Sequence, residues 1–260
     1  MLLVIDVGNS NNVIGLFSKE KLLTHWRIRT ECNRTADEYW VLIKEFILLN
    51  EVAAETVDDI IVACVVPSLI PILREMGQKY FSCDPMMVGP GIKTGISISY
   101  KNPTEVGADR IVNAVAAFSK HKKSLIIVDF GTATTFDAVS NKGEYLGGAI
   151  FPGVNISMEA LFKNTAKLPR VDLVTPERVI GKSTVESIQS GGVHGVAGMV
   201  NHIVAKMREE MGEKAMVIAT GGISNSFLAE LDIIDEVDPF LTLDGLLILY
   251  NRNRPQSDAI

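Results

Sequence analysis

An aspartate, a glycine two positions later and a row of small polar residues occur together twice in this chain, each time where an apolar run ends. Glycine lets the backbone turn where a side chain would clash, and the exposed amides of such a turn can bind an anion. The apolar runs 2–5, 13–17, 125–128 and 136–139 are typical of short buried strands paired as hairpins. The two copies are Asp6, Gly8 and residues 9–11, and Asp129, Gly131 and threonines 132, 134 and 135.

The aspartate of such a turn cannot bind a phosphate directly, because both groups are negative. It must act through a cation or a water, as carboxylates do at magnesium–phosphate sites. A single Asp-x-Gly turn is common in ordinary tight hairpins. Its repetition at the head of each half indicates two similar halves, and two such turns facing each other would hold a polyphosphate between two domains.

A second charged constellation is Asp109-Arg110, in the first turn of a helix that we expect from Thr104 to about His121. The helix dipole alone favours an aspartate there, so a solvated cap is the ordinary interpretation, but the dipole does not favour an arginine. The functional interpretation is that Asp109 accepts the proton of a substrate hydroxyl while Arg110 binds a carboxylate with its forked guanidinium. Spacing alone leaves the ordinary interpretation ahead.

Five stretches, in this order, make the chain resemble type III pantothenate kinases, within the actin-like ATPase superfamily of sugar kinases, acetate kinase and chaperone ATPases. They span nearly the whole chain and are residues 6–13, 107–110, 129–135, 147–148 with 152–153, and 219–222. The resemblance implies an α/β fold of two similar actin-like (ribonuclease H-like) domains, each a mixed β-sheet flanked by helices, with an interdomain cleft. It also implies ATP-dependent phosphorylation of pantothenate to 4'-phosphopantothenate, the first step of coenzyme A biosynthesis.

The resemblance assigns roles to individual positions, with Asp109 as the catalytic proton acceptor. It implies that the pantothenate contacts are Tyr100, Gly107, Ala108, Asp109, Arg110 and Thr184. It implies that the ATP contacts are Asp6, Val7, Gly8, Asn9, Ser10, Asn11, Asn12, Val13 and Thr132. Asp129 matches the ligand of a monovalent cation, K⁺ or NH₄⁺, and Mg²⁺ would come with ATP. Without the resemblance, Tyr100 would be half-buried packing and Thr184 a helix cap.

Length and composition narrow the class of protein. The chain has 260 residues, of which 47% are hydrophobic, enough for two compact domains that we expect at 1–117 and 118–260. Its net charge of −6 argues against a nucleic-acid partner, since such proteins are usually basic. No apolar stretch approaches the roughly 20 residues that span a bilayer, so we expect no membrane partner. The resemblance favours a homodimer.

The cysteines and histidines show no metal-site spacing. Cys32, Cys64 and Cys83 are far apart and are expected to be reduced thiols of a cytoplasmic protein. The four histidines, at 25, 121, 194 and 202, have no ligand spacing with acids or cysteines. Glycines 191, 192, 195 and 198 fall within a long helical pattern from 184 to 211 and suggest a very close approach of helices, at a domain interface or a dimer seam.

The remaining pattern supplies the elements that position these residues. Further strands are expected at 22–30, 59–66, 145–150, 215–219 and 233–237, with a strand-like piece at 96–100. Thr35 and Glu38 form a capping box before one helix, and Pro67 begins another that reaches about Tyr80. Later helices follow Gly153 and Ser183, and a last one covers 243–251. The order β-β-β-α-β-α of the first half recurs in the second.

Three alternatives stay open. A sugar or acyl kinase of the same superfamily would share the hairpins, although the zinc-containing sugar kinases carry a C-x-C-G-x-x-G-C loop that this sequence lacks. A nucleotide-switched assembly or chaperone protein would need extra subdomains that do not fit in 260 residues. A nucleotide-binding accessory or regulatory protein is the third, because members of the family have been described that way.

Overall fold

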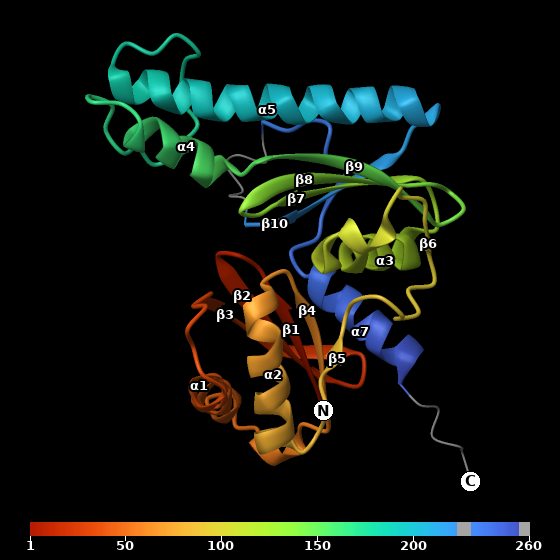
Figure 1. Cartoon of the computed structure of the whole chain (residues 1–260). Coiled ribbons are helices and arrows are strands. Elements are labelled where there is room, and N and C mark those ends of the chain that lie inside the picture. Colours follow the sequence, from red (N-terminus) through yellow and green to blue (C-terminus); the bar gives the residue numbers. More distant parts are fainter. Residues whose placement is uncertain (223–229, 255–260) are drawn as a thin grey trace. The chain divides into compact units, whose positions relative to one another are not determined.

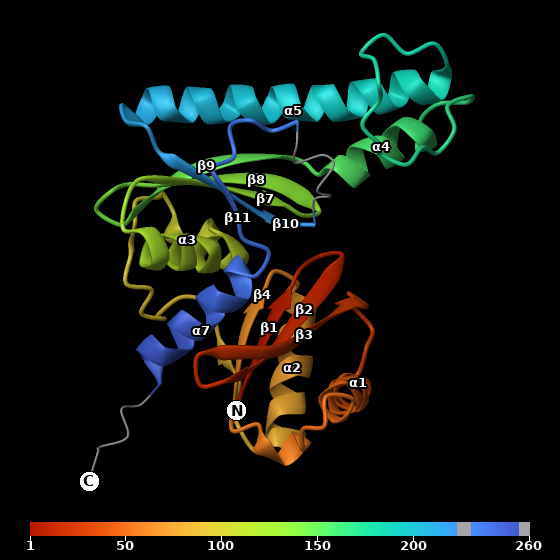
Figure 2. The same cartoon turned by 180° about the vertical axis from the view of Figure 1, so that it is seen from behind.

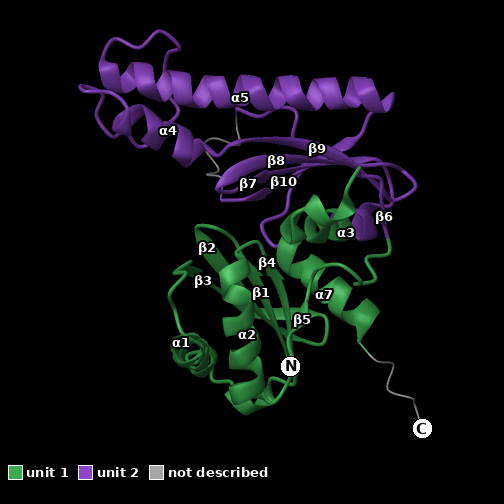
Figure 3. Cartoon of the chain, in the orientation of Figure 1, with its two compact units in different colours: residues 1–95, 101–116, 241–260 green, residues 96–100, 117–240 purple. Residues whose placement is uncertain are grey.

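The computed structural model describes residues 1–222 and 230–254, which fall into two compact units (Figure 3). Unit 1 comprises Met1–Gly95, Lys101–Ala116 and the chain from Leu241 onward, and unit 2 comprises Ile96–Tyr100 and Ala117–Phe240. The split at Ala116 lies next to the boundary expected after residue 117. The last helix, however, belongs to unit 1 and not to the second half, because α7 (Leu241–Asn253) packs on strands of the first sheet.

Unit 1 is built on a five-stranded sheet with the order β3-β2-β1-β4-β5. The strands are β1 (Leu2–Val7), β2 (Asn11–Ser18), β3 (Lys21–Arg29), β4 (Asp59–Cys64) and β5 (Met86–Met87). The first three form an antiparallel meander, and β4 and β5 add in parallel. The helical elements are α1 (Ala36–Leu48), α2 (Ile70–Met76), the 3-10 turns Ala54–Thr56 and Pro67–Leu69, and the π-turn Gly77–Phe81. The helix expected from Pro67 to Tyr80 is thus divided into three pieces.

Successive side chains of β1 point to opposite faces of this sheet and are buried on both. Leu3, Ile5 and Val7 are buried with side chains of α1 and α2, which lie on one face in Figures 1 and 2. On the other face, a Cβ at Gly15 would lie 2.9 Å from Val4 and 3.1 Å from Leu243 of α7. The capping box of α1 is confirmed, with the side chains of Thr35 and Glu38 each accepting from the other's backbone N–H.

Unit 2 is built on a six-stranded sheet with the order β11-β10-β7-β8-β9-β6. Its long helix α5 (Thr184–Met211) lies along one face in Figure 2, where its valines pack against β7 and β8. The shorter α4 (Val154–Lys163) follows β9 directly. The strands are β6 (Ser97–Ile98), β7 (Leu125–Phe130), β8 (Ala133–Val139), β9 (Glu144–Pro152), β10 (Met216–Gly221) and β11 (Glu236–Val237).

The two sheets repeat one topology, as the duplicated hairpins predict. The order β3-β2-β1-β4-β5 corresponds to β9-β8-β7-β10-β11, with the same antiparallel and parallel pairings. Asp6 and Asp129 each occupy the fifth position of a six-residue central strand with the same burial pattern. The mixed α/β fold of two similar sheets flanked by helices is therefore confirmed.

The helix expected from Thr104 begins later. Pro103–Glu105 form a 3-10 turn, and Val106 is extended, so that α3 covers Ala108–His121. The reason is local, because the side chain of Asn102 accepts from the Thr104 N–H and so caps the short turn separately. Glu105 therefore lies outside α3, while Asp109 remains in its first turn.

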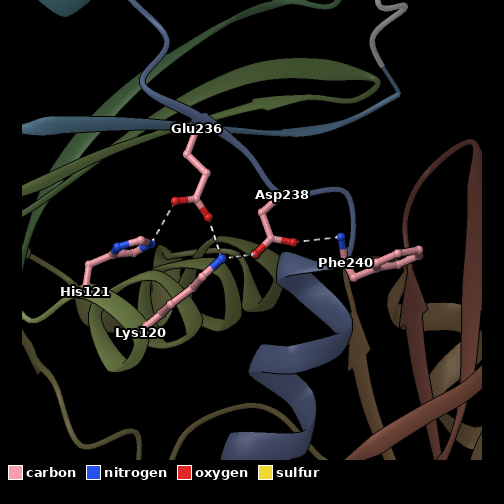
Figure 4. Close-up of polar contacts among 5 residues, drawn as sticks. All are labelled: Lys120, His121, Glu236, Asp238 and Phe240. Carbon is pink, nitrogen blue, oxygen red and sulfur yellow. Dashed lines mark hydrogen bonds and ion pairs between the residues drawn. The ribbon is translucent and has the colours of Figure 1, made fainter.

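The C-terminal end of α3 is held to the chain around β11 by a charged cluster within unit 2 (Figure 4). The Lys120 ammonium forms an ion pair with the Glu236 carboxylate and lies 3.3 Å from Asp238 Oδ2. His121 Nε2 lies 3.6 Å from Glu236 Oε2. Asp238 in turn accepts from the Phe240 N–H at 3.0 Å. The cluster fixes the residues that precede α7.

The glycines of α5 do not all mark close packing. A Cβ at Gly192 would lie 2.5 Å from Leu173 and 3.0 Å from the sulfur of Met158 in α4, so a close approach is confirmed there. At Gly191, Gly195 and Gly198 no such neighbour lies within 4 Å in the described chain. None of the helices in residues 1–222 and 230–254 is both long and apolar enough to cross a bilayer.

Candidate active site

The first hairpin turn presents polar groups at the end of a buried strand. The Gly8 N–H donates to the Asn11 carbonyl at 3.0 Å and closes the turn. Asn9, Ser10 and Asn11 are exposed at its tip. Asp6 lies one residue before the end of β1 and pairs with Val13 of β2. A ligand at this tip would meet backbone amides and small side chains, with a carboxylate at the strand end.

Asn12 differs from the other residues of this turn. It is fully buried, and its side-chain amide donates to the hydroxyl of Tyr39 at 2.8 Å. The hydroxyl of Thr30 lies 2.7 Å from Asn12 Oδ1 and 2.6 Å from the Gly8 carbonyl oxygen. The Asn12 side chain therefore supports the turn from within unit 1. Sequence reasoning missed Thr30 and Tyr39, because both bonds join residues distant along the chain.

At the start of α3, in the same unit, the Asp109 carboxylate bonds the backbone of the next residue, Arg110. Asp109 Oδ1 accepts from the Arg110 N–H at 2.8 Å, and a Cβ at Gly107 would lie 2.6 Å from that oxygen. The missing side chain of Gly107 thus leaves room for the carboxylate, and Ala108 begins the helix. Burial raises the pKa of Asp109, although the backbone bond and the charge of Arg110 partly offset this effect. A raised pKa makes the carboxylate a better proton acceptor.

Three of the sequence motifs meet around the second hairpin, in unit 2. Gly221, which ends β10 with φ +93°, would place a Cβ 2.5 Å from Asp129 Oδ1 and 2.7 Å from the Phe130 carbonyl oxygen. Gly153 packs against the turn itself, and its N–H donates to the Thr132 carbonyl at 3.1 Å. A carboxylate and a backbone carbonyl thus lie together beside a glycine, which is oxygen chemistry suited to a cation.

Tyr100 and Thr184 lie on different parts of unit 2. Tyr100 follows β6, and its ring centre lies 6.3 Å from that of Tyr145 in β9. Thr184 is exposed at the first position of α5, which Ser183 and not Thr184 caps. Thr184 lines an open pocket of about 800 Å³, and no other residue predicted for the site lines it. The pocket is formed with Met158, Leu161, Leu168, Gly181, Lys182, Ser183, Ser187, Ile188, Gly191 and Gly192.

A buried polar network behind Tyr100 was also missed. Asp137 of β8 is fully buried and accepts from the hydroxyls of Tyr145 and Thr135 at 2.7 and 3.2 Å. The available signal was an acid inside a run, 136–139, that was expected to be a buried strand. A carboxylate there requires hydrogen-bonding partners, because burying one without them is costly.

A family model described as type III pantothenate kinase matches residues 2–206. A type III pantothenate kinase of Myxococcus xanthus is 53% identical over 253 residues, covering 97% of this chain and 99% of the relative. The type III pantothenate kinase of Syntrophus aciditrophicus is also 53% identical, covering 97% of this chain and 100% of the relative.

Solved structures support the fold. A conserved Campylobacter jejuni protein described as a Baf family transcriptional activator matches with a TM-score of 0.60 at 19% identity, covering 96% of this chain and 98% of that one. Component A of the (R)-2-hydroxyglutaryl-CoA dehydratase of Acidaminococcus fermentans gives a TM-score of 0.55 at 14% identity, covering 96% of each chain. At these identities the likeness concerns the fold alone.

Proposed function

The chain belongs to the type III pantothenate kinase family, and from this premise we propose that it transfers the γ-phosphoryl group of ATP to the primary hydroxyl of pantothenate. The product would be 4'-phosphopantothenate, in the first step of coenzyme A biosynthesis. The observation that carries the proposal is the 53% identity to pantothenate kinases over nearly the whole length of both chains. The repeated strand–Asp-x-Gly–strand unit supports it independently, because turns with exposed backbone amides can bind phosphate.

The proposed nucleotide contacts are the first hairpin, residues 6–13, and Thr132 of the second. In the first hairpin the open tip of Asn9, Ser10 and Asn11 would meet the phosphates, and the Asn12 side chain would hold the tip in place. Mg²⁺ would neutralise charge on the phosphoryl oxygens when bound. Asp6 fits it as a carboxylate near a strand end, since Mg²⁺ is usually held by one or two carboxylates, phosphates and water.

The proposed proton acceptor is Asp109, with Arg110 binding the pantothenate carboxylate. Phosphoryl transfer has a loose transition state in most analyses, so the base orients the hydroxyl and takes its proton late. The raised pKa of Asp109 favours this role. Arg110 is only 7% exposed, and a buried guanidinium with its fixed fork is suited to a planar carboxylate. Tyr100 and Thr184 would line the pantothenate pocket.

A monovalent cation, K⁺ or NH₄⁺, is proposed at Asp129. The support is the Asp129 carboxylate and the Phe130 carbonyl, which lie together beside Gly221. Such a cation would offset the negative charge of both substrates in a protein whose own net charge is −6.

A homodimer is proposed from exposed apolar side chains of unit 2. Ile150 of β9 and Ile180 before α5 are 65% and 75% exposed. Monomers seldom leave large apolar patches in water, so a second copy is the proposed cover. The other exposed apolar residues between β9 and the start of α5 are Leu146, Phe151, Ile156, Leu161, Phe162, Val174, Val179 and Val185. Sedimentation velocity tests this, and a monomer at micromolar concentration would overturn it.

A cytoplasmic location is proposed from the cysteines. Cys32, Cys64 and Cys83 are all free thiols in the structure. Free thiols and use of ATP suit a reducing compartment.

The function is tested by coupled ADP release with ATP and Mg²⁺. We expect turnover with pantothenate and none above background with a panel of sugars and acyl acids. Turnover of a sugar or of acetate in place of pantothenate would overturn the substrate assignment. Nucleotide binding without any turnover would favour an accessory or regulatory protein.

A further inference from the structure

The fully buried Asp137 has no part in the proposed phosphoryl transfer. Among its contacts are the hydroxyls of Tyr145 and Thr135, which donate to its two carboxylate oxygens. A buried carboxylate is costly even when it is hydrogen-bonded, and an apolar residue of similar size is often at least as stable. What the carboxylate adds at this position is a fixed acceptor, which sets the direction in which the Tyr145 hydroxyl points.

The ring of Tyr145, held in this orientation, lies beside the ring of Tyr100. Tyr145 is fully buried in β9, and its ring centre lies 6.3 Å from that of Tyr100 with the two planes at 52°. The backbone joins the same two segments, because Ile98 of β6 pairs with Tyr145 and the Ser99 N–H donates to the Tyr145 carbonyl at 2.8 Å. Tyr100 is thus set against Tyr145 by both its ring and the residues just before it.

Gly147 completes this arrangement. It has φ +121°, which favours glycine, and a Cβ there would lie 3.4 Å from Cε2 of Tyr100. The pairing of β8 with β9 shifts register at Ala138/Val139, opposite Gly147 and Tyr145, as a bulge does. The glycine pair 147–148 has no part in the nucleotide and proton-transfer roles. Its first position is accounted for by the positive φ of Gly147, which brings the backbone of β9 against the Tyr100 ring.

We infer that Asp137 and Tyr145 are positioning residues that hold the Tyr100 ring against β9 beside Gly147, and so shape the wall that binds pantothenate. The inference rests on the proposed function, in which Tyr100 contacts pantothenate. Holding an aromatic wall in one place before the substrate arrives reduces the ordering that binding would otherwise require. The network therefore acts on pantothenate binding and not on phosphoryl transfer.

The first test is Tyr145→Phe, which removes only the hydroxyl that donates a hydrogen bond to Asp137. We expect the pantothenate KM to rise roughly 3- to 10-fold, the effect of losing about one hydrogen bond, while kcat and the ATP KM stay within about twofold. Tyr250→Phe is the matched control, because the Tyr250 hydroxyl donates to the Asp59 carboxylate in unit 1. It should leave the pantothenate KM unchanged. Calorimetry of pantothenate binding gives the same comparison without turnover.

A double-mutant cycle separates positioning from general support. If Tyr145 acts through Tyr100, Tyr145→Phe should have no further effect on the pantothenate KM in a Tyr100→Ala background. Effects that multiply independently would overturn the inference. Asp137→Asn keeps an acceptor for Tyr145 but makes it neutral, so it should raise the pantothenate KM less than Tyr145→Phe does. If Tyr145→Phe fails to fold, Asp137→Asn still tests the inference. A change in the ATP KM or kcat of Asp137→Asn, without a change in its pantothenate KM, would overturn the inference.

These outcomes are distinct from those that test the proposed function. A wild-type protein that does not phosphorylate pantothenate rejects the function. An active wild-type protein whose pantothenate KM is the same in Tyr145→Phe rejects the positioning role alone.

Discussion

The hydroxyl of Thr30 lies 2.6 Å from the carbonyl oxygen of Gly8, and so connects the end of β3 to the turn between β1 and β2. The Thr30 N–H also donates to the Ser10 carbonyl at 3.0 Å. Two groups of one residue therefore hold the turn whose tip is proposed to bind phosphate. A turn with fixed amides binds an anion better than a mobile one, because less order is lost on binding.

Thr30→Val should consequently weaken ATP binding. Valine has the same shape but no hydroxyl, so the backbone bond remains, while the single hydroxyl proton that lies between the Gly8 and Asn12 oxygens is lost. We expect the ATP KM to rise roughly 3- to 10-fold with little change in kcat, as for the loss of about one hydrogen bond. Thr30→Ser, which keeps the hydroxyl, is the control and should stay near wild type. An ATP KM for Thr30→Val that matches Thr30→Ser would contradict the role of the hydroxyl.

Asp109→Asn tests the proton acceptor. The amide keeps the size of the side chain and can still orient a hydroxyl, but it cannot take a proton. We expect kcat to fall by roughly 10²-fold or more, with a smaller change in the pantothenate KM. Steady-state kinetics with a thermal unfolding curve for each protein would check this. Near-normal kcat in the folded variant would show that another group accepts the proton.

The pH dependence of kcat tests the same residue differently. Burial raises the pKa of Asp109 above its ordinary value of 3.8, so the carboxyl stays protonated to a higher pH than an exposed aspartate would. Only the ionised form accepts a proton, and kcat should therefore fall as the pH falls through this raised pKa. The residual activity of Asp109→Asn should lack that acid limb. If the limb persists unchanged in the variant, it belongs to another group.

The local and repetitive features of this molecule could be predicted from the sequence. The hairpins, the capping box of Thr35 and the long helix α5 follow from short-range patterns, and the second sheet repeats the first because its sequence pattern does. The start of α3 was placed too early, because the side chain of Asn102 caps a separate 3-10 turn at Thr104. A separately capped turn just before the helix leaves no clear periodic signal.

Long-range contacts were beyond sequence reasoning. Thr30 looks like any strand-end threonine until the fold brings it to Gly8, and Tyr39 looks like a core residue of α1 until it meets Asn12. The return of α7 to unit 1 depends on Gly15 admitting Leu243 and on Gly245 contacting Val112, which are matters of tertiary packing. The motif around Asp129 was predictable as three separate stretches, but their convergence was not.

Arg110→Ala tests the proposed carboxylate contact. Asp109 and Arg110 are adjacent on a helix, so their side chains diverge by about 100° and should touch different parts of one small molecule. The carboxylate contact is much the same in the ground and transition states, so the pantothenate KM should rise while kcat changes less. The variant should also discriminate less against pantothenyl alcohol, which lacks the charge. If it rejects the alcohol as strongly as wild type does, the carboxylate is bound elsewhere.

Monovalent cations should activate the enzyme through Asp129. Activity in sodium or Tris buffer should be low and should rise on adding potassium or ammonium at fixed ionic strength and magnesium. Asp129→Ala should lose most of its activity and its response to potassium, because the carboxylate is the only charged ligand proposed for the cation. Equal rates in all of these salts would remove the reason to place a cation at Asp129.

Gly221→Ala connects this cation dependence to the geometry of the site. With φ +93° at Gly221, an added Cβ would lie 2.5 Å from Asp129 Oδ1 and 2.7 Å from the Phe130 carbonyl oxygen, so both oxygens must shift. We expect the potassium concentration for half-activation to rise several-fold. Gly89→Ala is the control, because a Cβ there meets no described residue within 4 Å. If both variants respond to potassium as wild type does, the oxygens beside Gly221 do not bind the cation, even where activity itself still depends on potassium.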